Sequence, residues 1–269
     1  MEEKLWKACG DGKVEEVITL LQNEQININW QDSQYSRTPF YRACGFGHIE
    51  VVKLLLNDNR VDINKATNKG GTPFYIACQK GHIEIAKLLL NDNIADINKT
   101  TNEGATPFSI ACRNGHIEIV KLLLNDERID TNKARNGGVT PFYIACQNEH
   151  IEIVKLLLND QRVDINKARN GGVTPFYIAC QKGHIEIAKY LLVCGREIDI
   201  NKKFNNTKTP LDISKQRSIS TQKFDWETDE QFQKVKRNCP KIVKLIEIAQ
   251  RNHNETKLRK ELAICKYFN

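Results

Sequence analysis

Residues 72–98 read TPFYIACQKGHIEIAKLLLNDNIADIN, and close variants of this stretch make up five copies along the chain. The opening Thr-Pro pair recurs every 34 residues, with its threonines at Thr38, Thr72, Thr106, Thr140 and Thr174. A fixed period of this length indicates a structure built from stacked repeats. The repeat therefore decides the fold class.

Each repeat predicts two antiparallel helices followed by a hairpin-like loop. The threonine is expected to cap the first helix, and proline suits the position that follows. The run PFYIAC gives a short inner helix, Gly-His a turn, and IEIAKLLL an outer helix with apolar residues at helical spacing. One unit cannot bury its apolar faces alone, so neighbouring units must stack. We therefore predict an all-α repeat solenoid.

The motif resembles the ankyrin-repeat family, whose signature TPLHxA at a period near 33 is matched here by TPFYIA, GHIEIVKLLL and DIN. The resemblance is strong over residues 1–201. The chain departs from the family in its longer period, in the tyrosine or serine at the signature histidine (Tyr41 in the second unit), and in Glu149, which replaces the turn glycine of the fifth unit. The resemblance implies that the concave face of the solenoid binds protein partners.

Three regions are predicted. Residues 1–34 form an N-terminal capping repeat, because they lack Thr-Pro and carry polar residues at otherwise apolar positions. Residues 35–205 hold five regular repeats, and residues 206–269 form a divergent C-terminal cap.

Within the C-terminal cap, the pattern restarts at residues 207–216 and matches an outer helix at 239–248. A polar insertion near 215–240 interrupts it, which we interpret as partly helical and mobile. The stretch NETKLRKELAICKYF at 254–268 predicts a basic final helix.

Cysteine and histidine recur at fixed spacing, as in Cys44 and His48, but each repeat contributes one of each. A metal site needs four ligands that converge on one point, and a catalytic pair is a single constellation. We interpret the cysteines as small core residues and the histidines as local hydrogen-bonding groups at the turn. We expect no metal, no cofactor and no enzymatic activity; the remaining place for a catalytic site is the 215–240 insertion.

Composition is that of an ordinary soluble chain, with 40% hydrophobic and 27% charged residues. The N-terminus does not resemble a targeting peptide, and no apolar run approaches about 18 residues. We expect a monomer in the cytoplasm, with the nucleus as the alternative.

The expected partner surface combines aromatic and charged residues near the N-terminus, the residue types that dominate interface energetics. We expect the anchor between Trp30 and Phe46. The predicted set is Trp30, Tyr35, Arg37, Tyr41, Arg42, Phe46, Lys69, Tyr75, Lys80, Glu103 and Arg113. The tyrosine stripe, which continues at Tyr143 and Tyr177, is open to a second interpretation as a packing ladder.

The net charge of +7 supplies an alternative function. Residues 1–201 carry 24 basic and 25 acidic residues, whereas residues 202–269 carry 16 and 8. The basic segment could bind nucleic acid or an anionic membrane. Its candidate anion-binding residues are Lys234, Lys236, Arg237, Lys241, Lys244, Lys257, Arg259 and Lys260.

Overall fold

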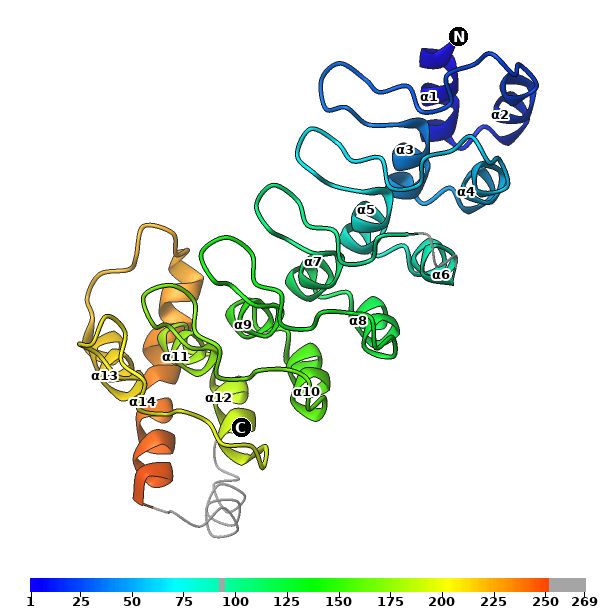
Figure 1. The fold of residues 1–269 in the computed structure, drawn as a ribbon. Helices are drawn as coiled ribbons and strands as arrows, with labels where there is room; N and C mark the ends of the chain where they lie inside the picture. The colour runs from blue at the N-terminus through cyan, green and yellow to red at the C-terminus, as the bar shows by residue number, and fades with distance from the viewer. Residues whose placement is uncertain (92–94, 252–269) are drawn as a thin grey trace. The chain divides into compact units, whose positions relative to one another are not determined.

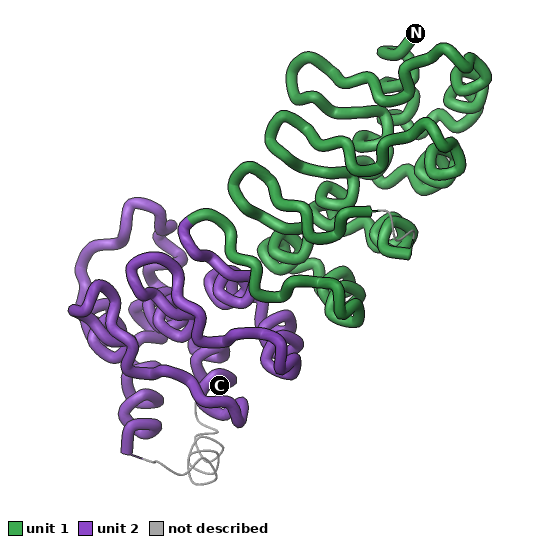
Figure 2. The backbone as a smooth tube through the Cα atoms, in the orientation of Figure 1, with its two compact units in different colours: residues 1–136 green, residues 137–269 purple. Residues whose placement is uncertain are grey.

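The computed structural model describes residues 1–91 and 95–251, which contain fourteen helices and no sheet (Figure 1). The chain divides into two compact units, residues 1–136 and residues 137–269 (Figure 2). The all-α repeat fold is as predicted. The boundaries at 34/35 and 205/206 stay predictions.

Unit 1 is a stack of four helix pairs. The inner helices contact one another in chain order, and each packs against its own outer helix. The pairs are α1 (Glu2–Asp11) with α2 (Val14–Leu21), α3 (Pro39–Phe46) with α4 (Ile49–Leu56), α5 (Pro73–Lys80) with α6 (Ile83–Asn91), and α7 (Pro107–Asn114) with α8 (Ile117–Leu124).

Unit 2 continues the same pattern with three further pairs. They are α9 (Pro141–Gln147) with α10 (Ile151–Asn159), α11 (Pro175–Gln181) with α12 (Ile185–Val193), and α13 (Pro210–Ile219) with α14 (Asp229–Arg251). The last outer helix differs from the others, because α14 is 23 residues long and contains Pro240.

The inner helices begin where the Thr-Pro pairs predict. Thr72 accepts a hydrogen bond from the Tyr75 amide at 3.1 Å, and the same cap recurs at the start of α3, α7, α9, α11 and α13. Behind the caps of α3, α5, α7, α9 and α11, a phenylalanine and a cysteine enter the core, as Phe74 and Cys78 do at no more than 1% exposure. Each buried phenylalanine contributes about 1.5–3 kcal/mol through loss of apolar contact with water.

The turn histidines correct one expectation, because they bond to the preceding repeat rather than locally. His82 Nε2 lies 3.1 Å from the carbonyl oxygen of Gly45, and His48 and His116 make the equivalent contact. A side chain at Gly47 would lie 2.7 Å from the His82 ring, and Gly47 also has a left-handed φ of 83°. The turn glycine and the histidine of the next repeat are therefore one packing unit.

The C-terminal cap also differs in detail from the prediction. Its outer helix begins at Asp229, ten residues before the expected match, so residues 220–228 are the connection between α13 and α14. The earlier start follows from burial, since Val235, Asn238 and Cys239 already lie on the packed face of α14. The predicted final helix at 254–268 lies outside the described residues.

Candidate protein-binding surface

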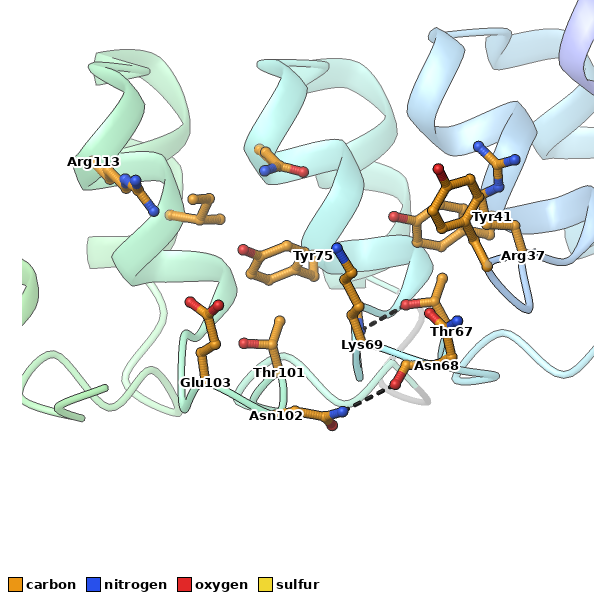
Figure 3. Close-up of a pocket in the computed structure, with 14 residues that line it drawn as sticks. Arg37, Tyr41, Thr67, Asn68, Lys69, Tyr75, Thr101, Asn102, Glu103 and Arg113 are labelled. Atoms are coloured by element: carbon orange, nitrogen blue, oxygen red, sulfur yellow. Dashed lines mark hydrogen bonds between the residues drawn. The ribbon is translucent and has the colours of Figure 1, made fainter. Parts of the chain in front are cut away.

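In unit 1, the hairpin loops and inner helices enclose a hollow of about 540 Å³ (Figure 3). Residues from three consecutive repeats line it. They are Tyr35, Arg37, Tyr41, Thr67, Asn68, Lys69, Gly71, Tyr75, Gln79, Thr101, Asn102, Glu103, Ile110 and Arg113. Seven of the eleven predicted partner-binding residues therefore line one site, namely Tyr35, Arg37, Tyr41, Lys69, Tyr75, Glu103 and Arg113.

Tyr41 and Tyr75 supply the aromatic wall of this hollow. Both are half-buried at the first turn of their inner helices. They meet across Gly71, where an added Cβ would lie 3.5 Å from the Tyr75 ring and 3.7 Å from the Tyr41 hydroxyl. Burial raises the pKa of Tyr41 to about 12 and also raises the pKa of Tyr75. Both hydroxyls therefore stay protonated at neutral pH and can donate a hydrogen bond to a ligand.

A ladder of asparagines holds the loops that form the rim. The Asn68 side chain donates to the Gln34 carbonyl at 3.1 Å, and the Asn102 side chain donates to the Asn68 carbonyl at 2.9 Å. The backbone amide of Asn102 also donates to the Lys69 carbonyl at 3.0 Å. This ladder was not predicted from the sequence, although asparagine recurs at the 34-residue period. Its effect is to fix the positions of Lys69 and Glu103.

The charged lining residues are spread across the hollow (Figure 3). Arg37 pairs with Asp32 at 3.1 Å and lies over the Tyr35 ring at 4.6 Å. Glu103 pairs with Arg135 at 2.6 Å. Lys69 and Arg113 are exposed and come from a loop and from the end of α7. A partner would meet aromatic surface and charge together, the combination typical of interface anchors.

Three more of the predicted residues form a separate cluster around Trp6. Trp6 itself was not predicted from the sequence. Arg42 lies 3.7 Å from the centre of the Trp6 ring and 5.1 Å from that of Phe46, while Trp30 meets Trp6 edge-on at 6.3 Å. The Trp6 indole donates to the Arg37 carbonyl at 2.9 Å. This cluster mainly packs the capping repeat against the second repeat, although Phe46 is 56% exposed.

Lys80 is the remaining member of the predicted set. It is exposed on the last turn of α5 and does not line the hollow. Its role in binding stays a prediction.

In unit 2, the tyrosine stripe belongs to the core. Tyr143 and Tyr177 are each 1% exposed, whereas Tyr41 and Tyr75 in unit 1 are only half-buried. The loop positions equivalent to Lys69 and Glu103 are Gly137 and Gly171. The tyrosines of unit 2 are therefore packing residues, whereas binding by the more accessible Tyr41 and Tyr75 of unit 1 stays a prediction.

The basic candidates on α14 do not all point to solvent. Lys234 pairs with Glu149, and Lys236 donates to the carbonyls of Ser218 and Ser220 at 2.7 and 2.9 Å. Arg237, Lys241 and Lys244 follow at helical spacing, and Arg237 and Lys244 are exposed. Lys257, Arg259 and Lys260 lie outside the described residues.

The cysteines in the part of the chain that the structure describes are unpaired, and all but Cys194 are buried. Burial raises the pKa of Cys9 and of Cys239 to about 12, so both thiols are protonated at neutral pH. Within residues 1–91 and 95–251, no cluster of three or more His, Cys, Asp or Glu side chains is placed to hold a metal ion. None of the helices in these ranges is long and apolar enough to cross a membrane.

Stacked helix pairs joined by hairpin-like loops define a helical repeat protein. The family model for ankyrin repeats in three copies matches five overlapping segments, at residues 5–101, 55–135, 93–169, 127–204 and 161–219. The chain belongs to the ankyrin-repeat family. Proteins of this family generally mediate protein–protein interactions. A comparison with curated proteins gave no significant match.

Proposed function

We propose that the chain is a scaffold that binds a protein partner in the hollow of unit 1. The proposal rests on the difference in side-chain type and exposure between equivalent positions of unit 1 and unit 2. Unit 1 presents Tyr41, Tyr75 and Lys69 where unit 2 has buried tyrosines and loop glycines. Side chains that differ from repeat to repeat on one accessible face indicate a surface specialised for a ligand, and the uniform repeats indicate a spacer.

The mechanism is presentation of a preformed surface. The rim loops are joined by hydrogen bonds from repeat to repeat, including Asn68 to Gln34 and Asn102 to Asn68. A surface that is already ordered loses little conformational entropy on docking, so a few contacts suffice for useful affinity. We place this monomeric adaptor in the cytoplasm, because unpaired cysteines are typical of a reducing compartment.

The alternative, anion binding through the basic C-terminal segment, rests on Arg237, Lys241 and Lys244, which share one side of α14. It has weaker support, since Lys234 and Lys236 are engaged within the fold. Salt distinguishes the two functions, because binding to phosphates weakens steeply as salt rises.

The test is quantitative affinity capture from lysate of the source cells, with Tyr41→Ser/Tyr75→Ser as the key variant. Serine is suitable because Ser109 occupies the same position in the fourth repeat and completes a capping box with Thr106 there. The control is Tyr190→Ser, which removes a partly exposed tyrosine from α12. Circular dichroism verifies that each variant folds.

We expect a protein that survives a high-salt wash on the wild type and on Tyr190→Ser. The Tyr41→Ser/Tyr75→Ser variant lacks two aromatic side chains of the hollow. It should therefore retain at least about tenfold less of this protein than the wild type does. Equal retention by all three proteins would overturn the hollow as the binding site. Retention that is lost at high salt and is insensitive to the tyrosines would favour the basic segment.

A further inference from the structure

The lining of the hollow in unit 1 is rich in positive charge, although unit 1 as a whole has nearly equal numbers of basic and acidic residues. Residues 1–136 contain 17 Lys and Arg residues against 18 Asp and Glu residues. The lining of the hollow nevertheless includes Arg37, Lys69 and Arg113 with Glu103 as its one acidic member among the described residues. The lining of the hollow therefore carries more positive than negative charge.

Two of the charged lining residues are paired with neighbouring side chains. Glu103 has its own cation in Arg135 at 2.6 Å, and Arg37 is matched by Asp32 at 3.1 Å. The two acidic groups and these two cations balance one another. Lys69 and Arg113 bring two further positively charged side chains to the lining, on either side of Tyr75 (Figure 3).

The rest of the lining suits a polypeptide backbone. The lining also includes hydroxyl and amide side chains, among them Thr67, Thr101 and Gln79, which can donate to and accept from peptide groups. The hollow is open and crosses three consecutive repeats, so an extended segment can follow it. The exposed carboxylate of Glu103 at one end disfavours a continuous run of phosphates.

We propose that the hollow binds an extended, acidic peptide segment of the protein partner, with its carboxylates facing Lys69 and Arg113 and its apolar side chains against Tyr41 and Tyr75. This inference rests on the proposed function and names the chemistry of the partner. Charge complementarity of this kind sets specificity and the rate of association.

The experiment is selection from a random peptide display library, with peptides of about twelve residues so that an extended chain at about 3.3 Å per residue spans the hollow. Three full-length proteins are used as bait: wild type, Lys69→Glu/Arg113→Glu, and Lys53→Glu/Lys121→Glu. The last is the matched control, because it makes the same charge change at exposed positions of the outer helices α4 and α8.

We expect the wild type and the control to select peptides enriched in Asp and Glu. The Lys69→Glu/Arg113→Glu variant should bind those peptides at least about tenfold more weakly, since like charges now face each other, and should select Lys and Arg instead. Selection of neutral or basic peptides by the wild type, or the same selection by all three baits, would overturn the inference. A labelled single-stranded oligonucleotide that displaces the selected peptides with higher affinity would overturn it in favour of nucleic acid.

The inference and the proposed function fail separately. A captured protein that depends on Tyr41 and Tyr75, together with a library selection that shows no acidic preference, would contradict only the acidic segment. A captured protein that is unaffected by the tyrosines would contradict the binding site itself.

Discussion

At the turn between α9 and α10, Glu149 adopts a left-handed φ of 63°, where the other regular repeats have glycine. A side chain in this conformation costs about 1–2 kcal/mol. The Glu149 carboxylate is held between Lys234 on α14 and the Nδ1 atom of His184, which lies 3.3 Å away. These contacts offset the backbone cost, and they join one turn of unit 2 to its last helix.

The charge of Glu149 predicts a pH dependence. Burial alone would raise the pKa of Glu149, but the nearby His184 ring and the Lys234 ammonium outweigh it and lower the pKa from 4.5 to about 2. A carboxyl with a depressed pKa stabilises the fold above its unfolded-state pKa and loses that contribution as pH falls through the folded value. Its stabilisation should therefore be complete above about pH 4.5 and disappear towards pH 2.

The measurement is the free energy of unfolding of wild type and Glu149→Gln across this pH range. At pH 7 we expect Glu149→Gln to be less stable by on the order of 1 kcal/mol, because partial exposure screens the ion pair. The difference should shrink as the pH approaches 2. Glu152→Gln, which removes an exposed pair with Lys155 on α10, should change stability by less than about 0.5 kcal/mol. A difference in the free energy of unfolding between wild type and Glu149→Gln that does not change with pH would contradict the role of the Glu149 charge.

At the scale of elements, a buried ion pair determines how α13 meets the connection to α14. Arg217 on α13 donates to both oxygens of Glu227 at 2.5 Å, and both side chains are at most 2% exposed. The Phe224 amide donates to Glu227 at 2.9 Å, and the Phe224 ring lies 4.2 Å from the guanidinium. The ion pair therefore holds the connection at residues 220–228 against α13.

Breaking this pair on one side should be costly. Arg217→Met leaves the Glu227 carboxylate buried without its cation, so we expect a loss of about 3–5 kcal/mol in the free energy of unfolding. In Arg217→Met/Glu227→Leu neither charge remains, and most of that loss should be recovered. Urea unfolding followed by circular dichroism and by tryptophan fluorescence measures both. A double variant no more stable than Arg217→Met would show that packing, rather than the stranded charge, dominates.

The repeated helices could be predicted from sequence because local signals agree with the periodic core pattern. Thr72 as a cap and Phe74 as a core residue follow from one motif. The start of α14 could not be predicted, because its first turns are polar and only tertiary packing shows that Val235 is buried. His82 was assigned a local bond for a similar reason, since its partner Gly45 belongs to the preceding repeat.

At the scale of the whole molecule, sequence identified which residue types could bind but not which of them share a site. Tyr41, Lys69 and Arg113 are far apart in the chain, and only the stacking of repeats brings them to one hollow. Trp30 and Arg42 were assigned to the same surface, yet they pack around Trp6. Composition cannot separate an aromatic that binds from one that packs, because burial depends on the neighbouring repeat.

Site-specific photocrosslinking in lysate of the source cells, with benzoylphenylalanine at one position of the full chain, tests whether a protein occupies the hollow of unit 1. The position in the hollow is Tyr35, which is 38% exposed, and the control is Ile18 on α2, which is 37% exposed. We expect a discrete protein adduct from position 35 and none from position 18. Equal labelling at both positions, or a discrete adduct from position 18 alone, would contradict a protein-binding hollow in unit 1.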